Sequence, residues 1–229
     1  KEEIFKQIDY LVSKRFSDKI VPVKKFKVQF TRMGEPAFND DVLDILEELP
    51  IRFKAKGLMP SISTIGPKNC DKFFKRLQEI KNSLYNNGKF QMQFSIHTTD
   101  IEKRNKLIPV SKMSFKEIAK YGKEFYADGD RKIILNFIVM KDYPIEPKVA
   151  RSYFDPDYFI IKLTPLNPTN SVINNKLTTE LDSHNPNSIN RLINQFHSLG
   201  FETIVSIGNL EEDIIGSNCG QYLSNFMEQ

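Results

Sequence analysis

Short stretches of the chain alternate between apolar and polar residues, which is the pattern of a β-strand with one buried face. In the first of them, polar residues separate Phe26, Val28 and Phe30. The later stretches are either alternating or continuously apolar over the length of a strand. Together they predict six strands, over residues 26–31, 58–64, 90–97, 132–139, 157–163 and 201–207.

The segments between these strands carry apolar residues at every third or fourth position, which is the spacing of an amphipathic helix. We predict helices over residues 1–15, 40–48, 67–84, 114–129 and 188–199. Ser114 and Glu117 have the spacing of a capping box. Pro67 suits a first helical turn, and Gly200 suits a helix end. A further short helix is expected in the tail from Ser217.

Strands alternate with helices through most of the chain, and this order is typical of a parallel sheet or barrel. Six strands are too few for a complete eight-fold barrel, so the expected fold is α/β with a partial (β/α)6 TIM-like barrel. We expect residues 1–229 to form one core domain. Ligands bind at the carboxyl ends of parallel strands, so the residues that end or follow each strand are the candidates for a site.

Polar residues and a glycine occupy these positions in four of the predicted strands. The candidates are Gly34, Glu35, Ser63, Ser95, His97 and Asn167. Glycine lets a ligand approach the backbone, a glutamate accepts hydrogen bonds from an ammonium group, and hydroxyl and amide groups donate and accept. The set suits a zwitterionic, nucleoside-like ligand better than a phosphate, because the chain has no glycine-rich phosphate loop. Each residue alone is more often explained by a turn or a structural hydrogen bond, so only their joint placement favours a site.

The composition narrows the class of protein only a little. The chain has 229 residues and a net charge of +4, which permits contact with nucleic acid and is also that of an ordinary basic surface. No apolar run approaches the length of a membrane span, and the N-terminus does not resemble a signal peptide. We therefore expect a cytoplasmic protein.

The two cysteines form neither a disulfide framework nor a CxxC pair. Cys219 stands between Gly216 and Gly220 in a polar segment, so an exposed, reactive thiol and a structural residue are equally favoured there. Cys70, near the start of a predicted helix, is interpreted as an ordinary residue.

Five segments of the chain together resemble the radical S-adenosylmethionine (SAM) methyltransferases that modify adenine in ribosomal and transfer RNA, the RlmN/Cfr family. The segments are, in order, MGEPAFND, SISTIGP, FSIHTTDIEKRNKLIPVSK, LTPLNP and DIIGSNCGQ. The family has closely similar segments in the same order and with similar spacing, and the likeness covers nearly the whole chain. The resemblance implies the partial barrel of radical SAM enzymes, SAM and a [4Fe–4S] cluster as cofactors, and a role in RNA modification such as rRNA processing.

The resemblance also implies roles for individual residues. Gly34 and Glu35 would hold the amino group of the methionine moiety of SAM. The other positions that bind SAM in the family correspond to Ser63, Ser95, Ile96, His97 and Asn167. Cys219 matches the cysteine that carries a methyl group during catalysis, so it is the expected catalytic residue. The expected partners are a ribosomal or transfer RNA substrate and an electron donor such as flavodoxin, and the expected state is a monomer.

Two features depart from the family. Its cluster is bound through CxxxCxxC, which this chain lacks, and two cysteines cannot supply three ligands. Every missing piece would lie before Lys1, so we expect the sequence to be the C-terminal part of a longer chain, without the first strand and the cluster loop of the barrel. The segment GSNCGQY also differs from the residues that usually precede the family's cysteine, which leaves the substrate open.

Two alternatives therefore stand beside the RNA methyltransferase. One is a relative without a cluster that binds SAM or RNA and carries out no radical chemistry. The other is a radical SAM enzyme of this lineage that acts on a different substrate.

Overall fold

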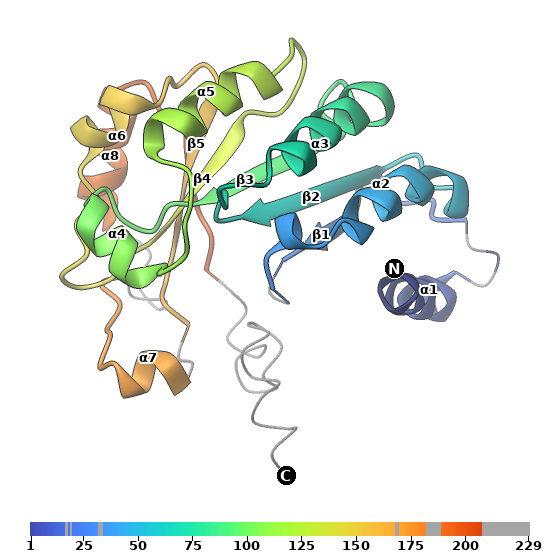
Figure 1. Cartoon of the computed structure of the whole chain (residues 1–229), viewed down its shortest axis with the longest axis horizontal. Helices are drawn as coiled ribbons and strands as arrows, with labels where there is room; N and C mark the ends of the chain where they lie inside the picture. Colours follow the sequence, from blue (N-terminus) through green and yellow to red (C-terminus); the bar gives the residue numbers. More distant parts are fainter. Residues whose placement is uncertain (17, 19, 32–33, 168–169, 182–188, 208–229) are drawn as a thin grey trace.

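All six predicted strands are present and lie parallel in one sheet, in the order of the sequence (Figure 1). The computed structural model describes residues 1–16, 18, 20–31, 34–167, 170–181 and 189–207. The strands are β1 (Phe26–Phe30), β2 (Leu58–Thr64), β3 (Gln91–Ser95), β4 (Ile133–Ile138), β5 (Phe159–Thr164) and β6 (Thr203–Val205). The parallel α/β arrangement predicted from the alternation of strands and helices is thus confirmed.

Helices connect the strands, as a parallel sheet requires. They are α1 (Glu2–Arg15), α2 (Asp41–Arg52), α3 (Asp71–Leu84), α4 (Ile101–Leu107), α5 (Phe115–Phe125), α6 (Pro147–Tyr153), α7 (Asn170–Asn174) and α8 (Asn190–Ser198), with a 3₁₀ turn η1 (Pro36–Phe38). The capping box predicted at Ser114 and Glu117 is formed. The short helices α4, α6 and α7 were not predicted. Among the described residues, every helix is too short or too polar to traverse a lipid bilayer.

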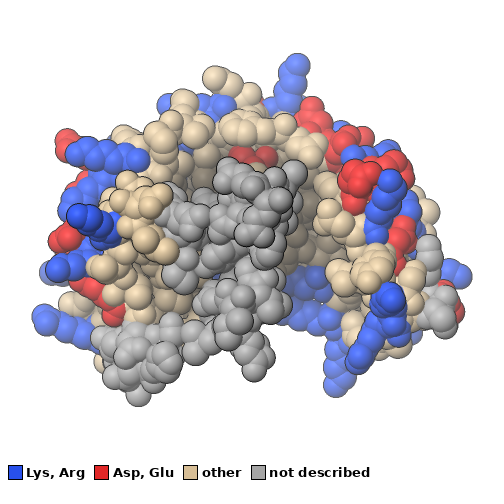
Figure 2. Space-filling view, turned by 90° about the horizontal axis from the view of Figure 1, so that it is seen from below, with Lys and Arg blue, Asp and Glu red and all other residues tan. Residues whose placement is uncertain are grey.

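The two faces of the sheet differ in what they contact. Along β5, Phe159, Ile161 and Leu163 are at most 1% exposed, whereas the alternate residues, among them Lys162 and Thr164, remain partly exposed. Helices α2, α3 and α5 lie along the outer side of the sheet (Figure 1), and a view from below shows the other side as a hollow (Figure 2). The strand alternation therefore separates an apolar outer face from an open inner face.

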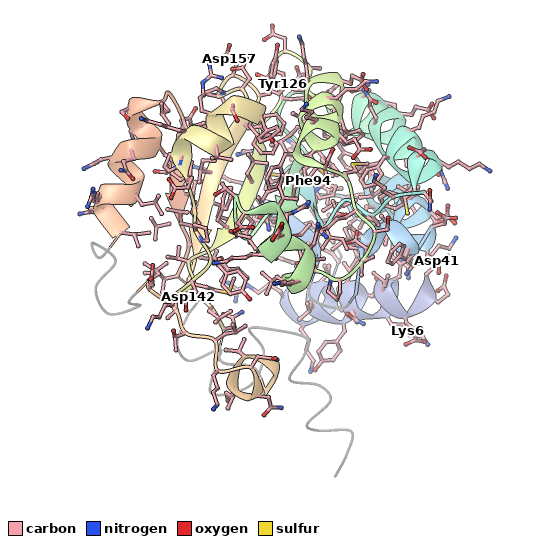
Figure 3. All side chains as sticks on the ribbon, turned by 60° about the vertical axis from the view of Figure 1, so that its left-hand side comes forward. Lys6, Asp41, Phe94, Tyr126, Asp142 and Asp157 are labelled. Atoms are coloured by element: carbon pink, nitrogen blue, oxygen red, sulfur yellow. The ribbon has the colours of Figure 1, made fainter. Side chains whose placement is uncertain are left out.

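Aromatic side chains fill the layer between the sheet and the helices. Phe94 of β3, labelled in Figure 3, is fully buried and meets Tyr121 of α5 edge to face at a ring distance of 6.1 Å. One turn of α5 approaches the sheet closely at Gly122, where a Cβ atom would lie 2.2 Å from the ring of Phe159. Only glycine is small enough for the packing at this position, although alanine has the higher intrinsic helix propensity.

Helix α2 runs further than the prediction for residues 40–48, because Pro50 is accommodated near its end. A proline has no N–H, so the carbonyl oxygen of Leu46 lacks its usual helical donor. The buried hydroxyl of Tyr85, which follows α3, donates to that oxygen. Burial raises the pKa of Tyr85, which keeps this hydroxyl protonated. The side chain thus replaces the missing backbone donor and joins α2 to α3.

The helix predicted for residues 67–84 was wrong over its first four residues, since α3 begins at Asp71. Asn69 has a φ of 63°, which ends any helix that would include it. Pro67 instead forms an isolated bridge with Lys112, and the N–H of Lys68 donates to Ser111. The other helix and strand ends differ from the predictions by a few residues. The helix expected from Ser217 lies outside the described residues.

A buried ion pair ties α3 to the turn before β4. The side chains of Lys81 and Asp130 are 1% and 8% exposed. The Lys81 ammonium also lies 5.0 Å from the centre of the Phe125 ring, and the Asp130 carboxylate accepts from the N–H of Ala127 at 3.1 Å. Both charges are therefore satisfied by partners that the fold supplies.

We predict that Lys81→Met lowers the free energy of unfolding by about 3–5 kcal/mol, because it leaves a buried carboxylate without its counter-charge. Lys81→Met combined with Asp130→Asn should cost clearly less than Lys81→Met alone. Urea denaturation measures both. Lys6→Met is the control, since Lys6 pairs with Glu3 on the exposed surface and its loss should change little. An equal cost for the single and double variants would contradict this account.

Candidate functional site

Gly34 follows β1 and leaves its backbone open to a ligand. Its φ is +100°, a conformation that L residues rarely adopt, and apart from its chain neighbours no atom of the described residues lies within 4 Å of the position that a Cβ would take. The glycine is thus required by the turn rather than by crowding. The result is an exposed strip of main chain immediately before Glu35.

Glu35 ties the loop after β1 to the end of β2. One carboxylate oxygen accepts hydrogen bonds from the N–H of Ala37, at 3.1 Å, and from the hydroxyl of Thr64. The other oxygen accepts from the N–H of Ile65 at 2.9 Å. A carboxylate offers about four acceptor positions, so Glu35 retains capacity for one more donor. Its first role is to position two loops, and a ligand ammonium would add to these bonds.

The loop after β2 is held from a second direction by Arg104 of α4. The Arg104 guanidinium is buried and donates to the carbonyl oxygens of Met113, at 3.0 Å, and Ile65, at 3.5 Å. It also stacks over the ring of Phe115 at 5.2 Å. Burial lowers the pKa of Arg104 to about 10, which leaves the group charged at neutral pH. Ile65 is therefore fixed at its N–H by Glu35 and at its carbonyl oxygen by Arg104.

The candidate serines lie on the inner face of the sheet. The hydroxyl of Ser63, on β2, accepts from the side-chain amide of Gln93 at 3.0 Å. Ser95 ends β3 and pairs in register with Asn136 of β4. Asn136 is 8% exposed, and its side-chain oxygen has no hydrogen-bond partner among the described residues. These groups place hydroxyl and amide functions near the carboxyl ends of neighbouring strands.

Strand β3 ends earlier than predicted because its backbone turns away from the sheet at His97. The N–H groups of Ile96 and His97 both donate to the carbonyl oxygen of Asn136, at 2.9 and 3.0 Å, and His97 has a φ of 67°. The Ile96 side chain is fully buried in the core, so only its backbone can face a ligand.

The His97 ring is held neutral. Part of the residue keeps contact with solvent, but its Nδ1 atom is buried and has no hydrogen-bond partner within the described part of the chain. Burial lowers the pKa of His97 to about 4, and the nearby Arg104 charge adds to the effect. A neutral imidazole with one unused nitrogen can donate or accept one hydrogen bond to a ligand.

The two remaining candidates are Asn167 and Cys219. Asn167 follows β5 and is partly buried, at the same end of the sheet as the loops after β1 to β3. Cys219 lies outside the described residues. The structure therefore brings the loop that carries Gly34 and Glu35 to the end of β2, which carries Ser63. Strand β3, which ends at Ser95 just before His97, pairs beside β2.

The inner face of the sheet contains a cavity of about 320 Å³ that the pattern of strand ends did not predict. It reaches the candidate site through Ser63, and its described lining residues are all polar or charged. They are Lys27, Gln29, Thr31, Ser61, Ser63, Gln93, Lys162 and Ser206. The polar positions of each alternating strand could have identified this surface, had they been compared across strands rather than only at strand ends.

A larger groove of about 540 Å³ lies elsewhere, beside Tyr143 and Leu192. Its described lining contains none of the candidate residues. The candidate site is therefore assigned from the converging loops and the polar inner face, and not from the volume of the groove.

The fold is that of the radical SAM partial barrels. A crystal structure of a radical SAM methyltransferase from Sphaerobacter thermophilus matches it with a TM-score of 0.67 and 18% sequence identity, over 94% of this chain and 59% of that chain. This chain thus spans less than two thirds of the protein that it matches. No protein-family model matches the sequence, and no curated protein does. At this level of identity the likeness shows the fold, and the expected partial barrel is confirmed.

The residues present fit SAM better than they fit a cluster. An open backbone at Gly34, spare acceptor capacity on Glu35 and the unused nitrogen of His97 suit a ligand with an ammonium group and several polar atoms. The described residues contain no group of three or more histidine, cysteine or acidic side chains that could hold a metal ion. The sequence has two cysteines, whereas a [4Fe–4S] cluster takes cysteine thiolates in larger number.

We predict that His97 makes the fold sensitive to mild acid. The unfolded chain takes up a proton near pH 6.5, whereas the folded protein resists protonation of His97 down to about pH 4. Stability should therefore fall as the pH drops through this window, by about 3 kcal/mol in total. In His97→Asn, which tolerates the positive φ, the free energy of unfolding should depend less on pH between 7 and 4.

The matched control is His197→Asn, because His197 is exposed on α8. It should leave the pH dependence of denaturant unfolding as in the unaltered protein. Equal slopes for His97→Asn and His197→Asn would show that His97 does not cause the acid sensitivity.

Proposed function

We propose that the chain is the SAM-binding part of a methyltransferase of the radical SAM class that modifies an adenine base in ribosomal or transfer RNA through Cys219. The observation that carries the proposal is the convergence of three loops in a radical SAM partial barrel. Glu35 binds the end of β2, and Ser63 binds Gln93 of β3, so residues far apart in the sequence meet at one end of the sheet. They belong to the segments that resemble the RlmN/Cfr family.

In this proposal the loops hold SAM through groups that are already positioned. The free acceptor position of Glu35 takes the ammonium of the methionine moiety, beside the open backbone of Gly34. Neutral hydrogen bonds to the rest of the cofactor come from the hydroxyl and amide groups of Ser63, Ser95 and Asn167. His97, being neutral, adds no charge next to the sulfonium of SAM.

Cys219 is proposed to receive a methyl group from SAM. Its thiolate sulfur forms a bond to the methyl carbon while the bond from that carbon to the sulfonium sulfur breaks, which releases neutral S-adenosylhomocysteine. Transfer from Cys219 to adenine requires the cluster chemistry of the class. Since the residues of this chain do not fit a cluster, the steps assigned to them end at the methylated thiol.

The substrate and partners in this proposal follow the resemblance. An adenine must leave its stack to enter the hollow of the barrel, and a net charge of +4 favours approach to RNA. A cytoplasmic monomer that receives electrons from a donor such as flavodoxin completes the proposal.

A second candidate is a relative without a cluster that binds SAM or RNA and performs no radical chemistry. It is favoured by one observation, the absence of CxxxCxxC from the sequence. Any coding sequence that precedes Lys1 and the iron content of the anaerobically purified protein separate the two candidates. A CxxxCxxC motif with bound iron supports the enzyme, and the absence of both supports the binding protein.

We predict that Cys219→Ala abolishes methyl transfer to RNA and leaves the affinity for SAM nearly unchanged, because the thiol accepts the methyl group and does not hold the cofactor. Transfer of a radioactive methyl group and equilibrium binding measure the two properties. Cys70→Ala is the matched control. Burial and nearby carboxylates raise the pKa of the Cys70 thiol, so it is less reactive and its loss should preserve activity. Loss of SAM binding in Cys219→Ala would contradict the assigned role.

We also predict that Glu35→Gln weakens SAM binding far more than Thr64→Val does. Both substitutions remove a hydrogen bond between the loops, at a cost of about 1–2 kcal/mol in the free energy of unfolding. Only Glu35→Gln also removes the negative charge that faces the ammonium. Calorimetry should show a loss of affinity of about ten-fold or more for Glu35→Gln beyond that of Thr64→Val. Equal losses would assign Glu35 a purely structural role.

A further inference from the structure

The described lining of the inner-face cavity is basic and contains no acidic residue. Two lysines line it, Lys27 of β1 and Lys162 of β5, together with hydroxyl and amide groups. Figure 2 shows lysine or arginine side chains within the hollow. The Lys27 ammonium forms no hydrogen bond or ion pair within the described part of the chain.

Other positively charged side chains act on Lys27. Lys27 keeps much of its surface in contact with water, yet the cavity encloses enough of it that burial lowers its pKa. The charges of Lys25, Lys162 and Arg131 lower that pKa further. Arg131 donates to the carbonyl oxygen of Gly88 and has no carboxylate partner among its described contacts. These positive charges repel the Lys27 ammonium, and an anion in the cavity would relieve that repulsion.

Neutral donors stand beside the lysines. Ser61 is 5% exposed, and the Ser63 hydroxyl accepts from Gln93, which leaves its own hydrogen free to donate toward the cavity. A volume of about 320 Å³ is enough for a small ligand group. Lysine side chains and hydroxyls around one small space are donors that match the several oxygens of a phosphate.

The position of Lys27 separates this cluster from the loops proposed to hold SAM. Lys27 lies near the amino end of β1, whereas Gly34 and Glu35 follow its carboxyl end. Lys27 and Phe30 are three positions apart on the strand, which is roughly 10 Å along the sheet. Ser63 of β2 lines the cavity and also belongs to the proposed SAM site, so the two regions adjoin at this residue.

We propose that the inner-face cavity is a phosphate-binding subsite, in which Lys27 contacts a phosphate group of the nucleotide substrate. The choice of a nucleotide rests on the proposed function, while binding of phosphate rests on the cavity alone. The phosphate belongs either to a free nucleotide or to the RNA backbone next to the base that is modified.

The test compares AMP with adenosine in calorimetric titrations of the full-length protein at fixed ionic strength. AMP should bind about ten-fold more tightly than adenosine, and Lys27→Met should remove that preference. Lys24→Met is the matched control, because it removes the same charge from an exposed residue that does not line the cavity. An AMP preference that survives in Lys27→Met, or is absent from the unaltered protein, overturns the proposal. The melting temperature of Lys27→Met checks that the variant is folded, as expected for a residue with much of its surface exposed.

A short single-stranded RNA distinguishes the two sources of the phosphate. If the RNA backbone enters the cavity, Lys27→Met should weaken RNA binding and reduce its dependence on salt by about one phosphate contact. If the AMP preference is lost while RNA binding is unaffected, the subsite takes a free nucleotide. A Lys27-dependent AMP preference without any methyl transfer would support the subsite and count against the proposed function. Methyl transfer without a Lys27-dependent preference for AMP would support the proposed function and count against the subsite.

Discussion

The pleat of the strands is the constraint on which the rest of this structure depends. Each strand sends alternate side chains to opposite faces, and the described helices α2, α3 and α5 cover the outer face of the sheet. The outer positions, such as Phe94 and Phe159, are therefore large and apolar. The inner positions, such as Lys27, Ser61 and Gln93, are free of the packing demands of the core and carry polar groups. Along each strand, alternate residues therefore belong to the core and to the inner surface.

The loop after β2, at the carboxyl end of the sheet, is held in place by contacts within the protein. Glu35 and Arg104 hold the backbone of Ile65 at its N–H and carbonyl oxygen, so the loop after β2 has little freedom. Rigid placement of this kind reduces the entropy that a ligand loses on binding. A carboxylate at a strand end therefore serves both the protein and its proposed ligand.

Hydrophobic periodicity was enough to predict the strands, their parallel order and most helices, because it depends on burial alone. The predictions failed where single residues set the backbone. The positive φ of Asn69 delays α3, and the bend at His97 shortens β3. Both conformations are supported by contacts with segments distant in the sequence, such as Ser111 for Lys68 and Asn136 for His97.

Part of the candidate site could be predicted from the sequence. Strand-end position and the family resemblance indicated Gly34, Glu35 and Ser63, and the segments that carry these residues lie together. The polar inner face was missed, because its residues are spread from β1 to the end of β6 and no short motif contains them. The role of Cys219 stays a prediction, as it lies outside the described residues.

The hydrogen bond from Tyr85 to α2 changes the stability that is expected from replacing Pro50 in that helix. Replacing a proline inside a helix by alanine is expected to raise stability, since it restores a backbone N–H and its hydrogen bond. In this chain the carbonyl oxygen of Leu46 already has a donor from Tyr85. The usual gain at Pro50 would be reduced, and the residue that limits it lies at the end of another helix, where a survey of α2 alone would overlook it.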